Sequence, residues 1–382
     1  MKVALVCDWL TTPGGAEKVL LELHHLYPHA PIYTSQYRPK KIDWFHDADV
    51  RTGWLNLFPA SLRRFLGVFR QIYFSHLDLS DYDLVISVTG AEAKSVKTKK
   101  TLSPHYSTHG SKSQYQSAFH LCYCHVPTQY YWQFYDQYLQ NPGFGILNPL
   151  ARLGLKILVK PLRKADYRAA QQPDQFVTIS NYAADQIQKY YHRQAKVVYP
   201  SVDYQKFIPK KPKKRSGFVI SCRQVTWKRV DLAIQACLKT QQPLTVIGDG
   251  PEHQNLVRLA KGSSLIKFIP WVQTAELAQH LQSSVAYIFP SLEPFGIAPV
   301  EALAAGCPVI AFVEGGSRDM ILPGKNGLLF AKQNVDSLTK ALHEFSSKKF
   351  HSATVSQSAV KFSAENFTQG ITKIIKSGVQ HS

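Results

Sequence analysis

The sequence contains no apolar run approaching the roughly 20 residues that a membrane-spanning helix requires, although hydrophobic residues make up 45% of its 382 positions. The apolar stretch at its start, Met1–Val6, runs directly into Cys7 and Asp8. A secretory signal peptide has a longer apolar region and a small-residue cleavage site. We therefore expect neither a transmembrane helix nor a signal peptide, and we expect the first residues to form a buried strand.

Cysteine is also scarce, with six residues in the whole chain. Cys122 and Cys124 are spaced to point the same way on a strand, but no second pair completes a zinc site. All six stand in or beside apolar segments. This placement predicts reduced, mostly buried thiols in a cytoplasmic protein.

Acidic residues are few compared with basic ones, 26 Asp and Glu against 45 Lys and Arg, which leaves a net charge of +19. Such a balance implies an anionic partner: nucleic acid, an acidic membrane face or a phosphate-bearing substrate. Composition alone does not choose among these three. The length of the chain fits two domains better than one core.

Strand-like and helix-like segments alternate through both halves of the chain, which predicts parallel sheets covered by helices on both faces. The expected fold is α/β, with two doubly wound domains whose ligands bind outside the carboxyl ends of the strands. A basic, proline-containing stretch at 210–217 precedes a new strand. We place the domain boundary there, which gives a first domain at 1–207, a second at 208–360 and a final segment at 361–382.

Four clusters of residues each follow an expected strand, and two of them are rich in glycine. Gly14 and Gly15 precede a helix, and Gly248 and Gly250 form a tight turn into another. Paired glycines let the backbone approach a ligand closely, and the amides of a helix N-terminus attract anions. Each cluster taken alone is equally consistent with a plain turn.

The other two clusters carry charge. Arg223 and Lys228 follow the first strand of the second domain, where two cations could neutralise the negative charge of a departing diphosphate. In the segment 290–310, Glu293 stands in a loop and Glu301 near the start of a helix. We expect Glu301 in the first turn of that helix, where the helix dipole favours a carboxylate and a ribose diol is within reach.

The last cluster resembles the Glu-x7-Glu motif of glycosyltransferase family 4, a large retaining family with the GT-B fold. The other three clusters match that family in order, so the resemblance covers residues 1–330. It implies two Rossmann-like domains facing a central cleft, with the final helix returning to the first domain. It also implies a glycosyltransferase that takes a hexose from a nucleotide diphosphate sugar.

The resemblance implies a role for each residue. Glu301 would hold the ribose and Glu293 would face the donor sugar, while Arg223 and Lys228 would bind the diphosphate. His125, in a His-x-Pro segment, would lie near the reacting sugar, and Asp319 stands where the family often has Glu. The implied catalytic residues are His125, Glu293, Arg223 and Lys228, and the implied donor-binding residues are Gly14, Gly15, Arg223, Lys228, Gly248, Gly250, Glu293, Phe295, Gly296, Ile297 and Glu301.

The same resemblance implies retention at the anomeric carbon, with no cofactor and no metal, because cationic side chains would do the work of a metal ion. Several segments are similar to bacterial mannosyltransferases of surface polysaccharide synthesis, although Ser201 departs from their usual Pro. We therefore expect GDP-mannose as donor and a glycan or lipid-linked acceptor, with UDP-sugars left open. Other readings are an epimerase or a phosphorylase on the same fold, or a non-enzymatic binding protein for nucleic acid or anionic surfaces. Nucleic acid is disfavoured, because the tyrosines fall mostly in expected strands and helices.

Two basic and apolar stretches, 59–70 and 149–164, could lie in an anionic membrane interface at the inner face of the cell membrane. The second carries Arg152, Lys156 and Lys160 at four-residue spacing beside many leucines. The alternative is a core helix with a solvated charged face, and Pro161 is expected to interrupt it. The polar segment 97–117 is expected to be a loop, either a solvated insertion or a cover over the acceptor.

Overall fold

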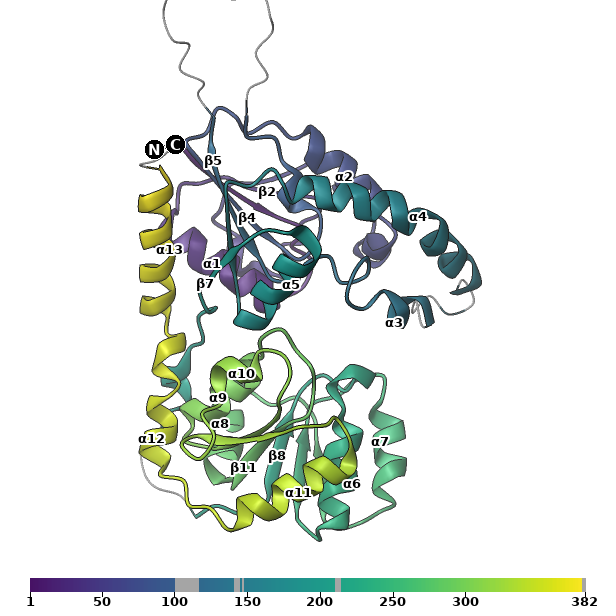
Figure 1. The fold of residues 1–382 in the computed structure, drawn as a ribbon, viewed down its shortest axis with the longest axis vertical. Coiled ribbons are helices and arrows are strands. Elements are labelled where there is room, and N and C mark those ends of the chain that lie inside the picture. The colour runs from purple at the N-terminus through teal and green to yellow at the C-terminus, as the bar shows by residue number, and fades with distance from the viewer. Residues whose placement is uncertain (100–116, 141–144, 146–147, 210–213, 380–382) are drawn as a thin grey trace, which may run out of the picture. The chain divides into compact units, whose positions relative to one another are not determined.

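The computed structural model describes residues 1–99, 117–140, 145, 148–209 and 214–379. The chain folds into two compact units (Figure 1). One comprises Met1–Tyr199 with Thr368–Ser382, and the other comprises Pro200–Phe367. The polar segment at 97–117 lies almost entirely outside the described residues, so its expected role stays a prediction.

The first unit is built on a seven-stranded parallel sheet with the strand order β3-β2-β1-β4-β5-β6-β7. The central strands β1, β4 and β5 are buried along their whole length, as expected of a parallel sheet with both faces covered. The strands are β1 (Val3–Cys7), β2 (Ile32–Thr34), β3 (Val50–Thr52), β4 (Leu84–Thr89), β5 (Phe119–Cys124), β6 (Gln175–Thr178) and β7 (Ala195–Val197).

Helices and short 3-10 turns connect these strands. Ser180 begins one of the helices by accepting a hydrogen bond from the amide of Ala183 at 3.0 Å, which is a standard N-cap. The α-helices are α1 (Gly15–Leu26), α2 (Gly67–His76), α3 (Tyr135–Gln140), α4 (Asn148–Ala169) and α5 (Asn181–Tyr191), and α13 (Ala364–Val379) supplies most of its length to this unit. The 3-10 turns used below are η2 (Trp54–Leu57), η3 (Ala60–Arg64) and η4 (Ala93–Ser95).

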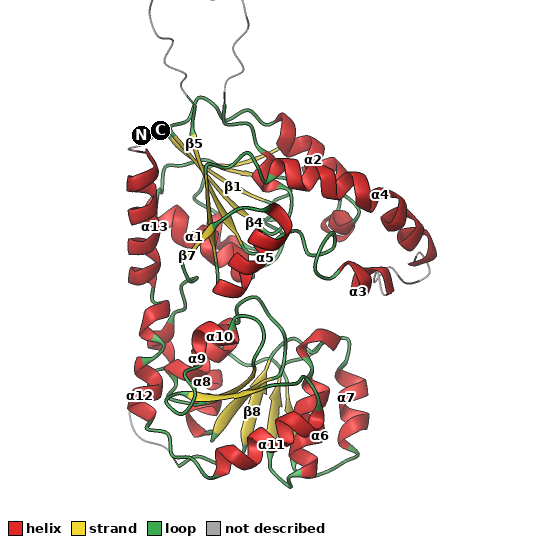
Figure 2. Cartoon of the chain, in the orientation of Figure 1, coloured by secondary structure: helices red, strands yellow, loops and turns green. Residues whose placement is uncertain are grey.

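The second unit repeats this architecture on a six-stranded parallel sheet with the order β10-β9-β8-β11-β12-β13. Helices α6, α7 and α11 lie on one face of the sheet and α8, α9 and α12 on the other (Figure 2). The strands are β8 (Phe218–Ser221), β9 (Leu244–Ile247), β10 (Ile266–Ile269), β11 (Ala286–Phe289), β12 (Val309–Phe312) and β13 (Gly327–Phe330). The helices are α6 (Val230–Lys239), α7 (His253–Ala260), α8 (Thr274–Ser283), α9 (Ile297–Ala304), α10 (Ser317–Met320), α11 (Val335–Ser346) and α12 (Ser352–Gln357).

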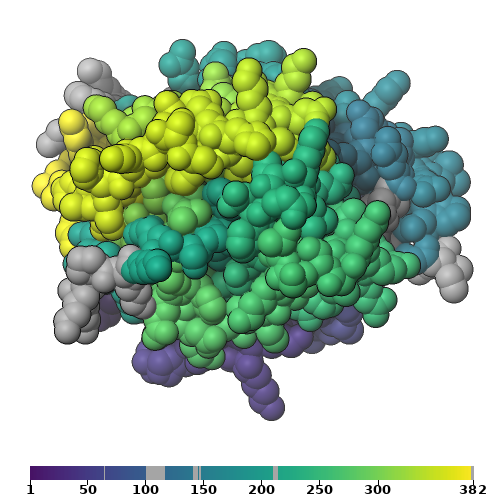
Figure 3. All heavy atoms as spheres, turned by 90° about the horizontal axis from the view of Figure 1, so that it is seen from below, coloured from purple at the N-terminus to yellow at the C-terminus, as the bar shows by residue number. Residues whose placement is uncertain are grey.

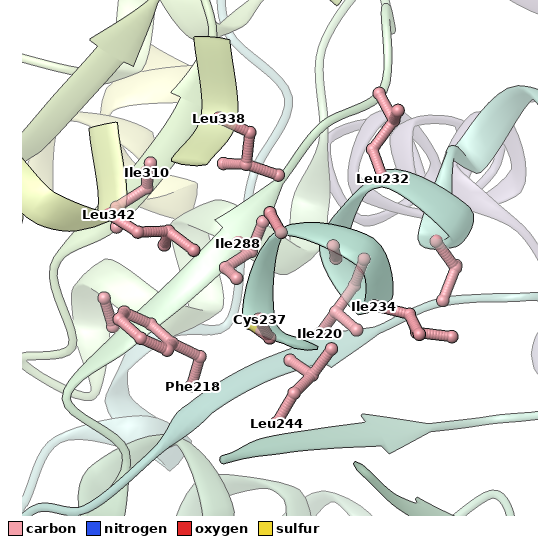
Figure 4. Close-up of a cluster of buried hydrophobic side chains, with 14 of the residues drawn as sticks. Phe218, Ile220, Leu232, Ile234, Cys237, Leu244, Ile288, Ile310, Leu338 and Leu342 are labelled. Carbon is pink, nitrogen blue, oxygen red and sulfur yellow. The ribbon is translucent and has the colours of Figure 1, made fainter. Parts of the chain in front are cut away.

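The largest core of the second unit lies between its sheet and helices α6 and α11. Figure 4 shows Ile220 and Ile288 from the strands pointing toward Ile234 of α6 and Leu338 of α11, and all four are fully or almost fully buried. Figure 3 looks onto the outer surface of this face, where the yellow of α11 runs beside the green of α6. This burial supplies the main stabilisation of the unit, at roughly 25 cal/mol per Å² of apolar surface.

Both sheets reverse the direction of their strand order at one point, between β1 and β4 in the first unit and between β8 and β11 in the second. There Val3–Cys7 pairs with Leu84–Val88, and Ala286 pairs with Phe218. The predicted α/β class with two Rossmann-like, doubly wound domains is therefore confirmed. Open sheets of this kind bind ligands at such switch points, outside the carboxyl ends of the strands.

One expectation about the helices is wrong. Helix α4 runs without a break from Asn148 to Ala169 and contains Pro161 in its interior. Proline removes the hydrogen bond to the carbonyl four residues earlier, that of Ile157. Both residues are exposed, so water can satisfy that carbonyl and the helix continues. Among the described helices, none is both long and apolar enough to cross a bilayer.

Candidate active site

The predicted residues of the second unit gather at the carboxyl edge of its sheet. Arg223 and Lys228 follow β8, Gly248 follows β9, and Glu293 follows β11. Strands β8, β9 and β11 are neighbours in the sheet. Because parallel strands end at the same edge, these loops lie close together although they are far apart in the sequence.

Lys228 and Glu293 form an ion pair at this edge, with 2.6 Å between Nζ and Oε2. The hydroxyl of Ser291 donates to the other carboxylate oxygen at 2.6 Å. The two charged side chains are 23% and 20% exposed, so both remain within reach of a ligand. The structure thus joins the cation and the carboxylate that the sequence analysis had placed in separate clusters.

Arg223 stands earlier on the same loop, and its side chain is exposed. The guanidinium group makes no hydrogen bond or ion pair with the residues that the structure describes. The family resemblance implies that Arg223 and Lys228 bind one diphosphate together. In the structure only Lys228 is held in place, which leaves Arg223 able to move toward a ligand.

The glycines of the loop after β9 are required by close packing of the backbone. Gly248 has a φ of +115°, and a Cβ there would lie 2.3 Å from the carbonyl oxygen of Cys222. A Cβ on Gly250 would lie 2.3 Å from the carbonyl oxygen of Gln224. The side-chain amide of Gln224 donates to the carbonyl of Gly248 at 2.7 Å. The loops after β8 and β9 are therefore joined directly by their backbones.

The backbone of Glu293 is held from the other side by the loop after β12. The amide of Gly316 donates to the carbonyl of Glu293 at 2.7 Å. Gly315 has a φ of +87°, and a Cβ there would lie 2.4 Å from the same carbonyl oxygen. The nearby Asp319 lies in α10, where its carbonyl accepts a hydrogen bond from Lys361. Glu293 therefore has a fixed main chain as well as a fixed carboxylate.

Glu301 lies in α9 and is half-buried, but its predicted place in the first turn is wrong. The helix begins at Ile297, and its first turn contains no acidic residue. Gly296, with a φ of +139°, is the N-cap, so the helix begins at Ile297 and Glu301 is its fifth residue. Phe295 is buried against Phe362, with 5.6 Å between the ring centroids, so its ring belongs to the packing beneath the loop.

The first unit has a site of its own at its switch point, a cavity of about 420 Å³. Gly14 is the N-cap of α1, and Gly15, the first residue of that helix, lines the cavity. His125 follows β5 and lines it as well. The Nδ1 of His125 donates to the carbonyl of Thr89 at 3.2 Å, and its Nε2 is buried without a partner among the described residues. Burial lowers the pKa of His125, so Nε2 carries a lone pair.

Asp8, which the sequence analysis did not select, holds this switch point together. It follows β1 and accepts hydrogen bonds at 2.8–3.1 Å from the hydroxyl of Thr89 and from the amides of Gly90, Ala91 and Ala93. The carboxylate therefore ties the end of β1 to the loop after β4. An aspartate directly after the first strand was the available signal, but its partners are more than 80 residues away.

A buried ion pair supports the segment that follows His125. Lys94 and Asp166 are each 1% exposed, with 2.6 Å between Nζ and Oδ1. Asp166 also accepts hydrogen bonds from Thr128 at 2.9 Å, from Trp132 at 2.7 Å and from Tyr191 at 2.8 Å. One carboxylate of α4 thus connects the loop after β5 to η4 and α5.

Glu17 lines the same cavity and is 9% exposed. Burial is the main cause that raises its pKa from 4.5 to about 7. A raised folded-state pKa means that ionisation opposes folding. The stability that Glu17 contributes is complete below pH 4.5 and is lost as the pH rises through 7.

We expect Glu17→Gln to remove a pH dependence of stability. The shift corresponds to about 3 kcal/mol, so the wild-type protein should lose about that much relative to Glu17→Gln between pH 4 and pH 8. Urea unfolding of both proteins across this range measures the difference. Parallel pH profiles for the two proteins would show that Glu17 does not titrate in this range.

Two Asp-x-Asp pairs occur in the sequence, Asp47 with Asp49 and Asp81 with Asp83. Asp49 is paired with Arg51, and Asp83 accepts a hydrogen bond from the amide of Lys2. Within the described ranges, no group of three or more His, Cys, Asp or Glu residues is arranged to hold a metal ion. Neither Asp-x-Asp pair belongs to the Lys228 and Glu293 site or lines the cavity of the first unit.

A comparison with protein families agrees with the site of the second unit. Residues 201–362 match the family Glycosyl transferases group 1. The group 1 match contains Lys228, Glu293 and Glu301, together with the glycine loops that position them. It ends before α13 begins and does not extend to the first unit.

Several curated glycosyltransferases are similar in sequence to part of this chain. An uncharacterized glycosyltransferase of Methanocaldococcus jannaschii is 25% identical over 213 residues, which are 54% of this chain and 60% of that protein. A GDP-mannose-dependent α-(1-6)-phosphatidylinositol monomannoside mannosyltransferase of Mycolicibacterium smegmatis is 29% identical over 37% of this chain and 44% of that protein. The chain thus spans less than two thirds of the length of these relatives.

Solved structures share the fold over the whole chain. The lipopolysaccharide outer core galactosyltransferase WaaB superposes with a TM-score of 0.67 at 18% identity, covering 98% of this chain and 99% of that one. Anabaena HepE in complex with UDP-glucose has a TM-score of 0.66 at 18% identity and covers 99% and 100%. The predicted GT-B class of fold is therefore confirmed.

Proposed function

We propose that this protein transfers a hexose from a nucleoside diphosphate sugar to an acceptor, with retention at the anomeric carbon. The observation that carries the proposal is the Lys228–Glu293 ion pair, 2.6 Å long, at the switch point of the unit with the group 1 match. Such an edge of an open parallel sheet is where nucleotides bind. In this proposal the pair offers a cation to the diphosphate and a carboxylate to the sugar.

The second unit supplies the groups that a departing diphosphate needs. Lys228 is a point charge whose position is already set by Glu293, and the exposed Arg223 can add a two-pronged contact to a phosphate. When the bond from the anomeric carbon to the phosphate oxygen breaks, negative charge grows on that oxygen. A preorganised cation stabilises this charge without having to move during the reaction.

Glu293 and Glu301 would bind hydroxyl groups on either side of the diphosphate. A carboxylate that accepts hydrogen bonds from Ser291 and Lys228 keeps lone pairs for hydroxyls of the donor sugar. Glu301, half-buried on α9 in the same unit, would accept from the ribose diol. The acceptor oxygen bonds to the anomeric carbon, and its proton passes to the leaving phosphate oxygen on the same face, which gives retention.

His125 would act in the first unit by accepting a hydrogen bond from a sugar hydroxyl. Its Nε2 is buried, unpaired among the described residues and neutral, because burial lowers the pKa of the ring. An unpaired buried acceptor is costly and is satisfied when a hydroxyl enters the cavity. The acceptor proposed here is a glycan or lipid-linked molecule of cell-surface polysaccharide or glycolipid synthesis, met at the cytoplasmic side of the membrane.

The proposed donor is GDP-mannose, which the name of the Mycolicibacterium relative supports. The HepE complex with UDP-glucose supports UDP-sugars as the alternative. A thermal-shift screen against GDP, UDP, ADP and their sugar conjugates separates the two, since a ligand of the folded state raises the melting temperature. We expect a shift with GDP-mannose that Glu301→Ala abolishes.

Other results of the screen have defined meanings. A shift with UDP-sugars alone would support the proposed transferase function, with a UDP-sugar instead of GDP-mannose as the donor. A shift that persists in Glu301→Ala would place the nucleotide elsewhere. If no nucleotide raised the melting temperature of the wild-type protein, the proposed function would be wrong.

We expect transfer to need no divalent metal, because the phosphate charge is to be met by Lys228 and Arg223. Activity in excess EDTA should equal activity with Mg²⁺ or Mn²⁺ within about twofold, whereas removing a metal that stabilises the charge would cost several kcal/mol of barrier. Activity that EDTA abolishes and Mg²⁺ restores would contradict this expectation.

A further inference from the structure

An exposed group of large apolar side chains covers the first unit around α2. It includes Leu57, which is 86% exposed, and Trp54, whose ring lies 6.2 Å from that of Phe58 and 5.9 Å from that of Phe69 between centroids. We call this set the aromatic patch, and it consists of Trp54, Leu57, Phe58, Leu62, Phe65, Phe69 and Ile72. Contiguous apolar surface of this kind marks an interaction site.

Helix α4 presents a second apolar stripe to solvent. Its members are spaced for one face of a helix, and they are 43% to 69% exposed: Leu150, Leu153, Ile157 and Leu158. The buried residues Val159 and Asp166, seven positions apart, lie on another face of the helix. Exposed basic residues run along one side of the stripe, namely Arg152, Lys156, Lys160 and Lys164.

The aromatic patch and the α4 stripe belong to the same part of the first unit. Helices α2 and α4 both pack against η4 and lie beside each other in Figure 1. Tyr131 connects them, because its hydroxyl is 3.2 Å from where a Cβ of Gly67 would lie and its carbonyl accepts from Arg163 at 2.5 Å. The two apolar groups thus lie on neighbouring elements of the first unit, and we call them together the docking surface.

The charge on this docking surface is of one sign. Residues 50–77 and 137–165, which carry the patch and the stripe, contain no Asp or Glu. Two such surfaces repel each other, which disfavours pairing between copies of the chain. A surface with phosphate groups above an apolar layer matches both properties, since side chains such as Ile157 can enter the layer while Lys156 and Lys160 meet the phosphates.

We propose that this docking surface binds the first unit to a membrane rich in anionic phospholipid. The apolar side chains enter the boundary between headgroups and acyl chains, and the lysines of α4 lie at the headgroup phosphates. The helix lies in the interface without crossing the bilayer. This binding needs no sugar nucleotide and does not depend on the proposed transferase activity.

Sedimentation with vesicles tests the proposal on the full chain. Vesicles of phosphatidylcholine alone are compared with vesicles that also contain phosphatidylglycerol, at about 0.05 M and about 0.5 M salt, because salt shortens the range of electrostatic attraction. We expect the protein to bind the anionic vesicles at low salt, at least tenfold more weakly at high salt, and the neutral vesicles weakly under both conditions.

Two double variants separate the electrostatic attraction to the headgroups from the insertion of apolar side chains. Lys156→Gln with Lys160→Gln should weaken binding to anionic vesicles about 30-fold, because each lysine contributes about 1 kcal/mol near such a surface. Leu153→Asp with Ile157→Asp should abolish binding. The matched control Lys332→Gln with Lys340→Gln removes two exposed lysines of the second unit and should leave binding unchanged. All the substituted side chains are exposed, and circular dichroism checks that each variant is folded.

Equal binding to neutral and anionic vesicles, or an equal effect of both lysine pairs, would overturn the proposal. So would a protein that binds no vesicle but forms a dimer which Leu153→Asp with Ile157→Asp dissolves, since the surface would then be a contact between copies. Nucleotide binding measured on the same samples keeps the two proposals apart. Vesicle binding without any nucleotide binding would contradict the proposed transferase function and would leave the proposed membrane binding supported.

Discussion

Lys228→Met is expected to lower the turnover number about 100- to 1,000-fold, the usual loss when one group that stabilises developing charge is removed from an active site. Methionine retains the length of the side chain, so the change is mainly one of charge. In the structure Lys228 is the cation held in place next to Glu293, 2.6 Å from it. Its loss leaves the departing diphosphate without preorganised positive charge, and steady-state kinetics with the donor found in the thermal-shift screen measures the effect.

A matched lysine in the same unit provides the control. Lys239 pairs with Asp336 at 2.8 Å, but both side chains are more than half exposed, and they belong to α6 and α11, which carry none of the Lys228 and Glu293 contacts. Lys239→Met should therefore leave turnover unchanged. Turnover of Lys228→Met within about threefold of wild type would exclude Lys228 from leaving-group stabilisation. An unchanged melting temperature without nucleotide separates a chemical effect from unfolding.

Asp166→Ala is expected to lower the free energy of unfolding by about 3–5 kcal/mol, the typical cost of leaving one charge of a buried pair without its partner. Lys94 would remain 1% exposed with no carboxylate near it. The hydroxyls of Thr128 and Tyr191 and the indole of Trp132 would lose their acceptor as well. Urea unfolding, followed by circular dichroism and tryptophan fluorescence, measures the change.

Two further variants isolate the role of burial. Asp49→Ala breaks an exposed pair with Arg51 and should change stability by no more than about 0.5 kcal/mol. Replacing both partners, Asp166→Leu with Lys94→Met, should recover part of the loss, because apolar residues of similar volume often replace a buried ion pair at little cost. A loss for Asp166→Ala no larger than for Asp49→Ala would mean that the buried pair does not hold the fold together.

Most of the fold was predictable because its central strands are short apolar runs bounded by turns. Such runs stand in the sequence at the positions of β1, β4, β8, β9 and β11. The strands β3 and β7 lack this signal. Each has three residues, lies at an edge of the sheet and is partly exposed, so neither forms a buried apolar run.

The sequence by itself determined the α/β class, the number of units and the order of the motif clusters, because all of these depend on local periodicity and on residues that follow strands directly. Only the tertiary structure decided that Lys228 pairs with Glu293, 65 residues away. It also decided that Asp8 accepts hydrogen bonds from the loop after β4 and that Asp166 accepts hydrogen bonds from four side chains. Such contacts depend on the order of strands across a sheet. That order results from the packing of the whole unit, and no stretch of residues encodes it on its own.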